Sequence, residues 1–372
     1  MAAIFDKKDL RDFDWQTALL AIAIASFGVW QIHNALPSES VWTKQIVGIG
    51  IALVAFVVVS FTDYRRLIET APLFYIFGLI LLILVLTPLG VQVNGQKAWV
   101  KLPIVGQFQP SEFVKIPTVL MLAKYFGSKK GHSLKFKEML VGCAIFAGPV
   151  GLIMLEPDAG QAITYFPILA AMFFLSGIKI RYVVLAMVTA AVMIPAAWYV
   201  GVETGTIKRY QQERILAITN PDKVDPRGYG YHTIQSTITV GKGELSGIKG
   251  DTETSQSVLK FLPEPQTDFI FAVTAENTGF IGCVSLLLAY AILLSRMIAG
   301  ARQASDRAGM LVIMSIVCGM VFQIFINVGM ALGVLPVIGV PLPLMSAGLS
   351  ALLSTFIAIG FVVSVRLRRF VN

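Results

Sequence analysis

Three stretches of the sequence place ionisable side chains at the edge of apolar runs that are long enough to cross a membrane. PSEFVKIP carries Glu112 and Lys115, LEPDAGQA carries Asp158, and Asp268 follows the proline-bracketed tip PEPQT, with Glu276 two turns further in. Charged groups are costly in such surroundings, and they usually face the protein interior or a wet cavity and mark function. The chemistry open to these carboxylates is the gain or loss of a proton beside hydrocarbon.

Each of these groups also has a structural interpretation. The i,i+3 spacing places Glu112 and Lys115 on one helix face, where they can form an ion pair. Asp158 could cap the N-terminus of the helix that follows it, and Asp268 could do the same for a later helix. A helix N-terminus favours the ionised carboxylate, whereas partial burial favours the neutral acid, so both interpretations stay open.

The composition is that of a membrane protein. Of the 372 residues, 56% are hydrophobic and 14% are charged, whereas a soluble domain carries roughly 25% charged residues. Apolar runs of about twenty residues recur along the chain, and each can cross the hydrocarbon core as a helix. We predict an all-α polytopic membrane protein with about ten transmembrane helices. The expected spans are 16–36, 43–61, 70–89, 112–126, 138–155, 160–177, 182–200, 268–295, 308–335 and 344–365.

Basic residues are distributed unevenly between the two sets of short loops. If the N-terminus is inside, the outer short loops hold only Lys44, Lys97 and Lys101. Short cationic loops stay in the cytoplasm, so both termini are expected there. The net charge of +8 is then a topology signal, and the sequence shows no basic polar face for a nucleic acid. The inner set holds Arg65, Arg66, Lys129, Lys130, Lys135, Lys137, Lys179, Arg181, Arg296, Arg302, Arg307, Arg366, Arg368 and Arg369.

The chain is expected to form one integral membrane domain over residues 1–372, with two polar segments on its outer side. The larger is 202–267, between the seventh and eighth spans, and loops of this length in compact proteins are either functional or disordered. Its mixed apolar pattern favours a folded cap on the membrane surface. The smaller, 90–111, alternates apolar and polar residues around Trp99, which predicts a re-entrant or surface-lying piece.

Several common catalytic motifs are absent from the sequence. No G-x-x-x-x-G-K-[ST] loop supports ATP-driven transport, and no G-x-S-x-G nucleophile elbow occurs. The three histidines, His33, His132 and His232, are far apart and lack the spacing of metal ligands.

The C-terminal segment NVGMALGVLPVIGVPLPLMSAGLSA resembles the hallmark of the SEDS (shape, elongation, division and sporulation) proteins, the RodA/FtsW family. QPSEFVK, EPDAGQA, GYGYHTIQS and FLPEPQTDFIFAVTAEN resemble other family segments, so the resemblance runs essentially from end to end, and the short termini look more like RodA. Three positions depart from the family pattern: Leu349 replaces a glycine, Gln266 a histidine and Ala98 an arginine. The matching hallmark residues are Asn327, Gly333, Pro336, Gly339, Ser346, Gly348 and Ser350.

The resemblance implies a peptidoglycan glycosyltransferase that polymerises lipid II at the outer face of the bacterial cytoplasmic (inner) membrane during cell elongation, which sets rod shape. It implies a class B penicillin-binding protein with a single transmembrane helix as transpeptidase partner, besides other membrane proteins of the elongation complex. By the same resemblance, Asp268 corresponds to the catalytic acid and Glu112 with Lys115 to a buried pair of the family.

In the mechanism that this implies, Asp268 accepts the proton of the acceptor sugar's 4-hydroxyl as that oxygen attacks the donor's anomeric carbon. The leaving pyrophosphate needs cationic help, either from basic side chains or from a divalent ion, Mg²⁺ or Mn²⁺, that carboxylates would bridge. Trp99 either stacks on a sugar or anchors the interface. The candidate substrate- or cation-binding residues are Asp158, Trp99, Lys97, Lys101, Arg209, Arg214 and Glu264.

Two other functions fit parts of the sequence. A flippase for lipid-linked oligosaccharides such as lipid II would need charge along a path from the inner face, whereas Asp158, Asp268 and the long loop gather outside. A non-catalytic scaffold for the transpeptidase would tolerate loss of Asp268. The partner's span is expected to pack on the eighth or ninth span, where Gly279 and Gly282 allow close approach.

Overall fold

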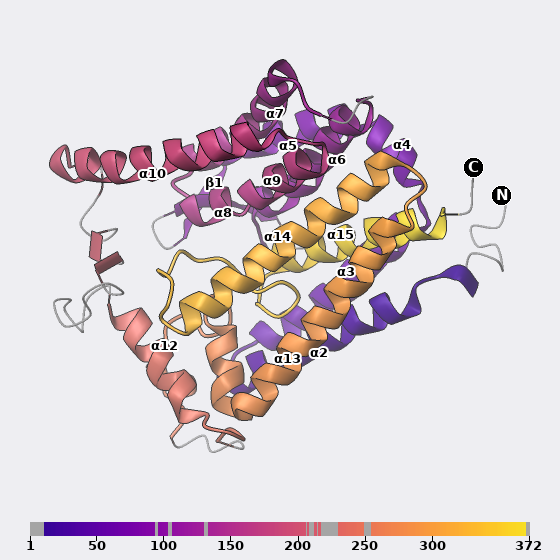
Figure 1. Ribbon diagram of the computed structural model, residues 1–372. Helices are drawn as coiled ribbons and strands as arrows, with labels where there is room; N and C mark the ends of the chain where they lie inside the picture. The colour runs from indigo at the N-terminus through magenta and orange to yellow at the C-terminus, as the bar shows by residue number, and fades with distance from the viewer. Residues whose placement is uncertain are drawn as a thin grey trace.

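The computed structural model is built mainly of helices (Figure 1). It describes residues 11–93, 96–102, 106–129, 133–205, 207, 212–213, 215–216, 230–248 and 254–369. The helices are α2 (Trp15–Ala35), α3 (Val41–Phe61), α4 (Tyr64–Glu69), α5 (Ala71–Leu86), α6 (Pro110–Gly127), α7 (Phe136–Leu155), α8 (Ala159–Ile163), α9 (Phe166–Leu175), α10 (Ile180–Glu203), α12 (Tyr231–Lys242), α13 (Ile270–Arg302), α14 (Arg307–Ala331) and α15 (Leu349–Leu367).

The apolar runs of the sequence account for the long helices. Within the described ranges, seven helices are long and apolar enough to cross a membrane, and 71–86 and 159–175 are shorter apolar helical segments. The sixth expected span is split into α8 and α9, because Pro167 near the start of α9 has no N–H to donate back to the preceding turn. The chain is therefore a multi-pass membrane protein, as the composition predicts.

The segment after α5 corrects the expectation of an all-α chain. It forms an antiparallel sheet of three strands, β1 (Gly90–Val93), β2 (Gln96–Leu102) and β3 (Gly106–Phe108), in that order. The alternation of apolar and polar residues noted in the sequence is the period of these strands. Val91 pairs with Trp99 and Gln92 with Lys97, so Ala98 is an extra residue in β2, a β-bulge.

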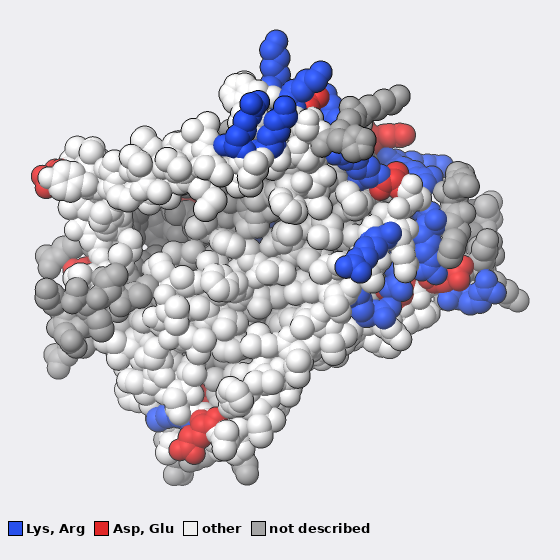
Figure 2. Space-filling model, in the orientation of Figure 1, with Lys and Arg blue, Asp and Glu red and all other residues white. Residues whose placement is uncertain are grey.

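Lys and Arg side chains gather at one end of the molecule, where α4 and the last turns of α13 and α15 lie (Figure 2). Asp14 begins α2 at this end, and its carboxylate accepts hydrogen bonds from Arg296 of α13 (2.7 Å) and from Arg366 of α15. The first and last described helices therefore meet at the basic end.

The buried core is formed mainly by α2, α3, α6, α13, α14 and α15. In contrast, α10 extends away from this bundle (Figure 1), and only Gly201 of its residues is buried. Its apolar side chains are therefore exposed along nearly its whole length.

A turn of the long polar segment 202–267 inserts into a break in α13. Gly279 has a left-handed, non-helical backbone (φ +65°), which glycine adopts readily. The N–H groups that the break releases are satisfied from the turn, because Phe280 donates to the Glu244 carbonyl (2.8 Å) and Ile281 to the Leu245 carbonyl (3.2 Å).

The two glycines of α13 singled out in the sequence both lie close to groups of this chain. A Cβ on Gly279 would lie 2.5 Å from backbone atoms of the turn 245–247, and one on Gly282 would lie 1.9 Å from the hydroxyl oxygen of Thr278 in the same helix. Gly279 therefore serves the close approach of the turn, and Gly282 is partly exposed on the surface of α13.

Candidate functional site

Asp268 lies just before the first turn of α13 and is half-buried. The N-cap position belongs to Phe269, the residue after Asp268. A partly exposed carboxylate at the edge of an apolar helix can accept a proton from a polar group outside.

The backbone around Asp268 is fixed by the C-terminal segment that precedes α15. Asn327 donates from Nδ2 to the carbonyl of Asp268 (2.9 Å) and also to that of Val340 (2.9 Å). The hydroxyl of Ser346 donates to the carbonyl of Thr267 (2.6 Å). Two of the hallmark residues of the sequence, Asn327 and Ser346, therefore hold the carbonyls of two consecutive residues.

The side chain of Asp268 lies against a glycine of the same C-terminal segment. Gly339 has a left-handed backbone (φ +73°), and a Cβ on it would lie 3.5 Å from Oδ2 of Asp268. A Cβ on Gly160 would lie 2.0 Å from the carbonyl oxygen of Ile338, the residue before Gly339. Residues 338–339 therefore lie close both to Asp268 and to α8, which Asp158 caps.

The departure from the family pattern at Leu349 is accommodated by the local backbone. Gly348 alone takes a positive φ (+146°), and Leu349 begins α15 with helical geometry. Gln45 of α3 holds the turn from both sides, since its Nε2 donates to the Ser346 carbonyl (3.1 Å) and its Oε1 accepts from the Gly348 N–H (3.2 Å).

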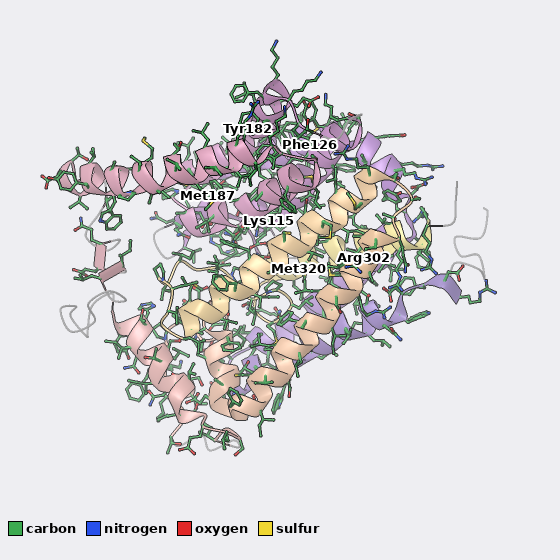
Figure 3. The ribbon with its side chains drawn as sticks, in the orientation of Figure 1. Lys115, Phe126, Tyr182, Met187, Arg302 and Met320 are labelled. Carbon is green, nitrogen blue, oxygen red and sulfur yellow. The ribbon has the colours of Figure 1, made fainter. Side chains whose placement is uncertain are left out.

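Glu112 and Lys115 form the predicted ion pair, with Nζ 3.0 Å from Oε2. The other carboxylate oxygen accepts from Nε2 of Gln161 in α8 (2.7 Å), so the pair joins α6 to α8. The pair also lines a pocket among α6, α9, α14 and α15, and Figure 3 labels two of its lining residues, Lys115 and Met320.

Asp158 is the N-cap of α8, as one of the two sequence interpretations predicts. Its Oδ1 accepts from the Gln161 N–H (3.0 Å) and its Oδ2 from Nε2 of Gln109 (2.9 Å). The backbone N–H of Gln109 donates in turn to the hydroxyl of Ser350 in α15 (2.8 Å). Burial raises the pKa of Asp158, and the neighbouring charge of Glu112 adds to the increase, although the hydrogen bonds oppose it.

Sequence reasoning gave no role to Glu156, the residue that follows the span α7. The side chain is fully buried, and the described residues offer neither of its oxygens a hydrogen bond. Burial, with a smaller effect from the charge of Asp158, raises the pKa of Glu156 to about 8. The signal in the sequence was the EPD run, because two acids so close together at the end of an apolar run cannot easily both ionise.

Of the two lysines of the sheet, Lys97 makes a hydrogen bond and Lys101 is exposed. Lys97 donates from Nζ to the carbonyl of Leu86 (3.3 Å), the last residue of α5, where a cation is favoured by the helix dipole. Lys101 is exposed and Trp99 is half-buried, whereas Ala98 is fully buried.

The other candidate residues belong to the long polar segment 202–267. Glu264 is exposed and accepts a hydrogen bond from Nε2 of Gln266 (3.0 Å). Arg209 and Arg214 lie outside the described residues. In the part of the chain that the structure describes, no group of three or more His, Cys, Asp and Glu side chains could hold a metal ion.

Comparisons with known proteins agree along the whole chain. Residues 15–369 match the model of the FtsW/RodA/SpoVE family, which is described as a cell cycle protein family. The peptidoglycan glycosyltransferase MrdB of Escherichia coli K12 is 35% identical over 354 residues, which cover 94% of this chain and 92% of MrdB.

Two solved structures extend this likeness to the fold. A chain from a peptidoglycan synthase complex, described as coordinating polymerization and crosslinking, superposes with a TM-score of 0.82 at 31% identity, covering 97% of this chain and 99% of the other. Rod shape determining protein RodA of Thermus thermophilus superposes with a TM-score of 0.72 at 27% identity, covering 97% and 98%. The match over nearly all of its residues shows that this chain belongs to the FtsW/RodA/SpoVE family.

Proposed function

We propose that this chain is a peptidoglycan glycosyltransferase that polymerises lipid II into glycan strands for cell elongation, with Asp268 as general base. The observation that carries the assignment to Asp268 is its placement, half-buried at the edge of an apolar helix with its backbone carbonyl held by Asn327. The similarity to a peptidoglycan glycosyltransferase supports the class of reaction.

The reaction suits a carboxylate at this depth. The substrate carries a polyprenyl tail in the lipid and a sugar headgroup outside, so its reacting carbon lies at the interface, where Asp268 is anchored. The acceptor's 4-hydroxyl oxygen attacks the donor's anomeric carbon while Asp268 takes the hydroxyl proton. The bond from that carbon to the pyrophosphate oxygen breaks, undecaprenyl pyrophosphate leaves with the electron pair, and the configuration inverts. Holding both lipids in one plane supplies orientation.

Stabilisation of the leaving pyrophosphate is assigned to basic residues of the outer face. Lys101 is the exposed cation of the sheet, whereas the ammonium group of Lys97 is engaged at the end of α5. Either these cations or a divalent ion, Mg²⁺ or Mn²⁺, would stabilise the leaving pyrophosphate.

The proposed topology has ten crossings in one domain of residues 1–372, with segment 202–267 outside between the seventh and eighth. The crossings are α2, α3, α5, α6, α7, α8 with α9, α10, α13, α14 and α15. The basic end faces the cytoplasm, which places both termini there and Asp268 at the outer face of the cytoplasmic membrane.

The proposed partner is a class B penicillin-binding protein whose single helix packs on α13 or α14, with other elongation proteins nearby. On α13, Phe280, Ile281, Leu288 and Ile292 are exposed apolar side chains that a helix in lipid could cover. The similarity to a chain of a peptidoglycan synthase complex supports a transpeptidase partner.

The deciding experiment gives labelled lipid II to the purified chain with its partner while transpeptidation is inhibited. Asp268→Asn keeps the shape of the side chain but removes the base, and we expect glycan polymerisation to fall about 10²- to 10⁴-fold. Glu244→Gln is the matched control, because its side chain on the same outer loop is exposed. Polymer that persists in Asp268→Asn and Asp268→Ala would remove Asp268 from the mechanism, and lipid II flipping without polymer would favour a flippase.

A further inference from the structure

Glu276 is a buried carboxylate that receives several hydrogen bonds from one short stretch of the outer loop. Its Oε1 accepts from the Gln256 N–H (2.5 Å). Its Oε2 accepts from the hydroxyl of Ser255 (3.1 Å), from the N–H of Ser257 (3.4 Å) and from the hydroxyl of Ser257. The side chain is fully buried, and every contact uses Glu276 as acceptor, which suits an ionised carboxylate.

The helical segment that carries Glu276 is short and is not continuous with the rest of α13. Residues 270–278 end at the non-helical Gly279, so the helix beyond this point does not fix their position. The outer loop holds the segment instead, since the Ile248 N–H donates to the Glu276 carbonyl (2.9 Å). Glu276 therefore joins a two-turn helical unit to the outer loop through both its backbone and its side chain.

The stretch that Glu276 holds leads directly to Asp268. From Ser257 the chain runs to Gln266. There the Ala347 N–H donates to the Gln266 carbonyl (2.7 Å), so the C-terminal segment holds this end of the connection. The connection is thus fixed at its start by Glu276 and at its end by residues 346–347. Asp268 lies between this connection and the helical unit of residues 270–278, so the chain on each side of it reaches Glu276, while Asn327 and Ser346 hold the carbonyls of Asp268 and Thr267.

We propose that Glu276 is a positioning residue, which sets the place of the Asp268 carboxylate by holding residues 255–257 against the first two turns of α13. This rests on the proposed function of Asp268 as general base. Glu276 does not touch the substrate in this account, and its effect reaches the reaction only through the placement of Asp268.

The first test is kinetic and uses Glu276→Gln. The amide keeps the size of the side chain but has one acceptor oxygen in place of two. Whichever way the amide is turned, its NH₂ faces a backbone N–H that can only donate, that of Gln256 or that of Ser257, so the stretch is displaced. A small displacement of a catalytic group lowers the rate strongly, so we expect kcat to fall about tenfold or more, with KM for lipid II changed less than about twofold. Glu244→Gln on the same loop is expected to match the wild type. Equal kcat for Glu276→Gln and Glu244→Gln would overturn the proposal.

The second test reads the position of residue 268 without using activity. In a background where Cys143, Cys283 and Cys318 are replaced by alanine, Asp268→Cys supplies the only thiol for a water-soluble methanethiosulfonate reagent. Adding Glu276→Gln should change the labelling rate about threefold or more, because thiol reactivity depends on access. Adding Glu244→Gln should leave the rate unchanged, and equal rates in all three proteins would contradict the proposal.

The two tests separate the possible failures. If Asp268→Asn still polymerises lipid II, the proposed function fails, yet the labelling rate still reports whether Glu276 positions residue 268. If Glu276→Gln does not fold in detergent, Ser257→Ala replaces it, since this change removes one hydroxyl donor and leaves the charge of Glu276 in place. A smaller change of kcat and labelling rate in the same direction supports the proposal, and wild-type values for both overturn it.

Discussion

Buried carboxylates at the two ends of the helical bundle are held in opposite ways. At the basic end, Asp14 accepts hydrogen bonds from two arginines, Arg296 and Arg366. At the end that carries Asp268, Asp158 accepts only from amide groups and Glu156 has no hydrogen bond within the described chain. Asp14 is therefore paired directly with two cations, whereas Asp158 and Glu156 form no ion pair within the described chain.

The titration of these groups follows their surroundings. Burial alone would raise the pKa of Asp14, but its hydrogen bonds with Thr17 and Arg296 and the charges of the two arginines lower it overall. Burial raises the pKa of Asp158, which lacks a direct cationic partner among the described residues. Asp14 is therefore held as a carboxylate by its arginines, whereas Glu156 at the other end, with a pKa raised to about 8, can change protonation state near physiological pH.

The strongest test of this contrast removes the carboxylate of the basic end. Asp14→Ala leaves the Arg296 and Arg366 guanidinium groups partly buried without their shared partner and removes the N-cap of α2. We expect the free energy of unfolding to fall by about 3 kcal/mol, because removing one partner of a buried ion pair leaves the other charge buried and uncompensated. Thermal unfolding in detergent would measure the loss.

Asp12→Ala is the control for this change. Asp12 lies two residues away and has only a surface pairing with Arg11, at 3.7 Å. Exposed pairs contribute about 0–1 kcal/mol, so its unfolding should stay near that of the wild type. Similar unfolding midpoints for Asp14→Ala and Asp12→Ala would show that the basic end is not fixed by these arginines.

The positions of the seven long apolar helices could be predicted from the sequence because insertion in a bilayer depends on local apolar content. The departures came from contacts between residues distant in the sequence. At the break at Gly279, the carbonyl groups of Glu244 and Leu245 replace the helix's own carbonyls as hydrogen-bond acceptors. The sequence near Gly279 gives no indication of these distant partners. The three-stranded sheet was missed because its alternation was interpreted as a surface-lying segment, although the period was visible.

In the candidate site too, local contacts could be predicted from the sequence and long-range contacts could not. The pair of Glu112 with Lys115 and the cap formed by Asp158 could be predicted, since both depend on spacings of three residues. The hydrogen bond of Gln109 to Asp158 joins residues 49 positions apart, and that of Asn327 to the Asp268 carbonyl joins residues 59 apart. Their residue types carry no signal of such pairing.

The raised pKa of Glu156 makes the stability of its end of the bundle depend on pH. Glu156 titrates near pH 4.5 in the unfolded chain and at about 8 when folded, so folding requires the neutral acid. Below pH 4.5 both states are protonated and the group has no effect, while the penalty on stability grows from pH 4.5 to about 8 and is then constant. Glu156→Gln removes the penalty, and we expect a gain on the order of 2 kcal/mol at pH 7.

The measurement for Glu156→Gln is the unfolding midpoint of variant and wild type from pH 5 to pH 9. The gain should be small near pH 5 and should grow toward pH 8, because only the wild type must keep a proton. Glu138→Gln in the first turn of α7 is the control, since its carboxylate is partly exposed beside Lys129. A gain independent of pH would mean that Glu156 is not the titrating group.

The smallest effect is expected at Asp158, where the contrast concerns catalysis rather than stability. Asp158→Asn keeps an oxygen for the Gln161 N–H, and asparagine caps helices as well as aspartate does, so the unfolding midpoint should hardly change. Its amide group faces Nε2 of Gln109, so the link from Gln109 to Ser350 of α15 is disturbed. Asp158 caps α8, which lies against the same residues 338–339 as Asp268, and we expect lipid II polymerisation to fall about tenfold.

Asp158→Ala separates the two roles of this carboxylate. It removes the cap as well, so it should lower the free energy of unfolding by about 1 kcal/mol while reducing polymerisation by a similar factor to Asp158→Asn. If Asp158→Asn instead lowers the unfolding midpoint as far as Asp14→Ala does and leaves polymerisation intact, Asp158 is a structural anchor like Asp14. The two ends of the bundle would then differ in charge alone, because the carboxylates of both would serve only to hold helices together.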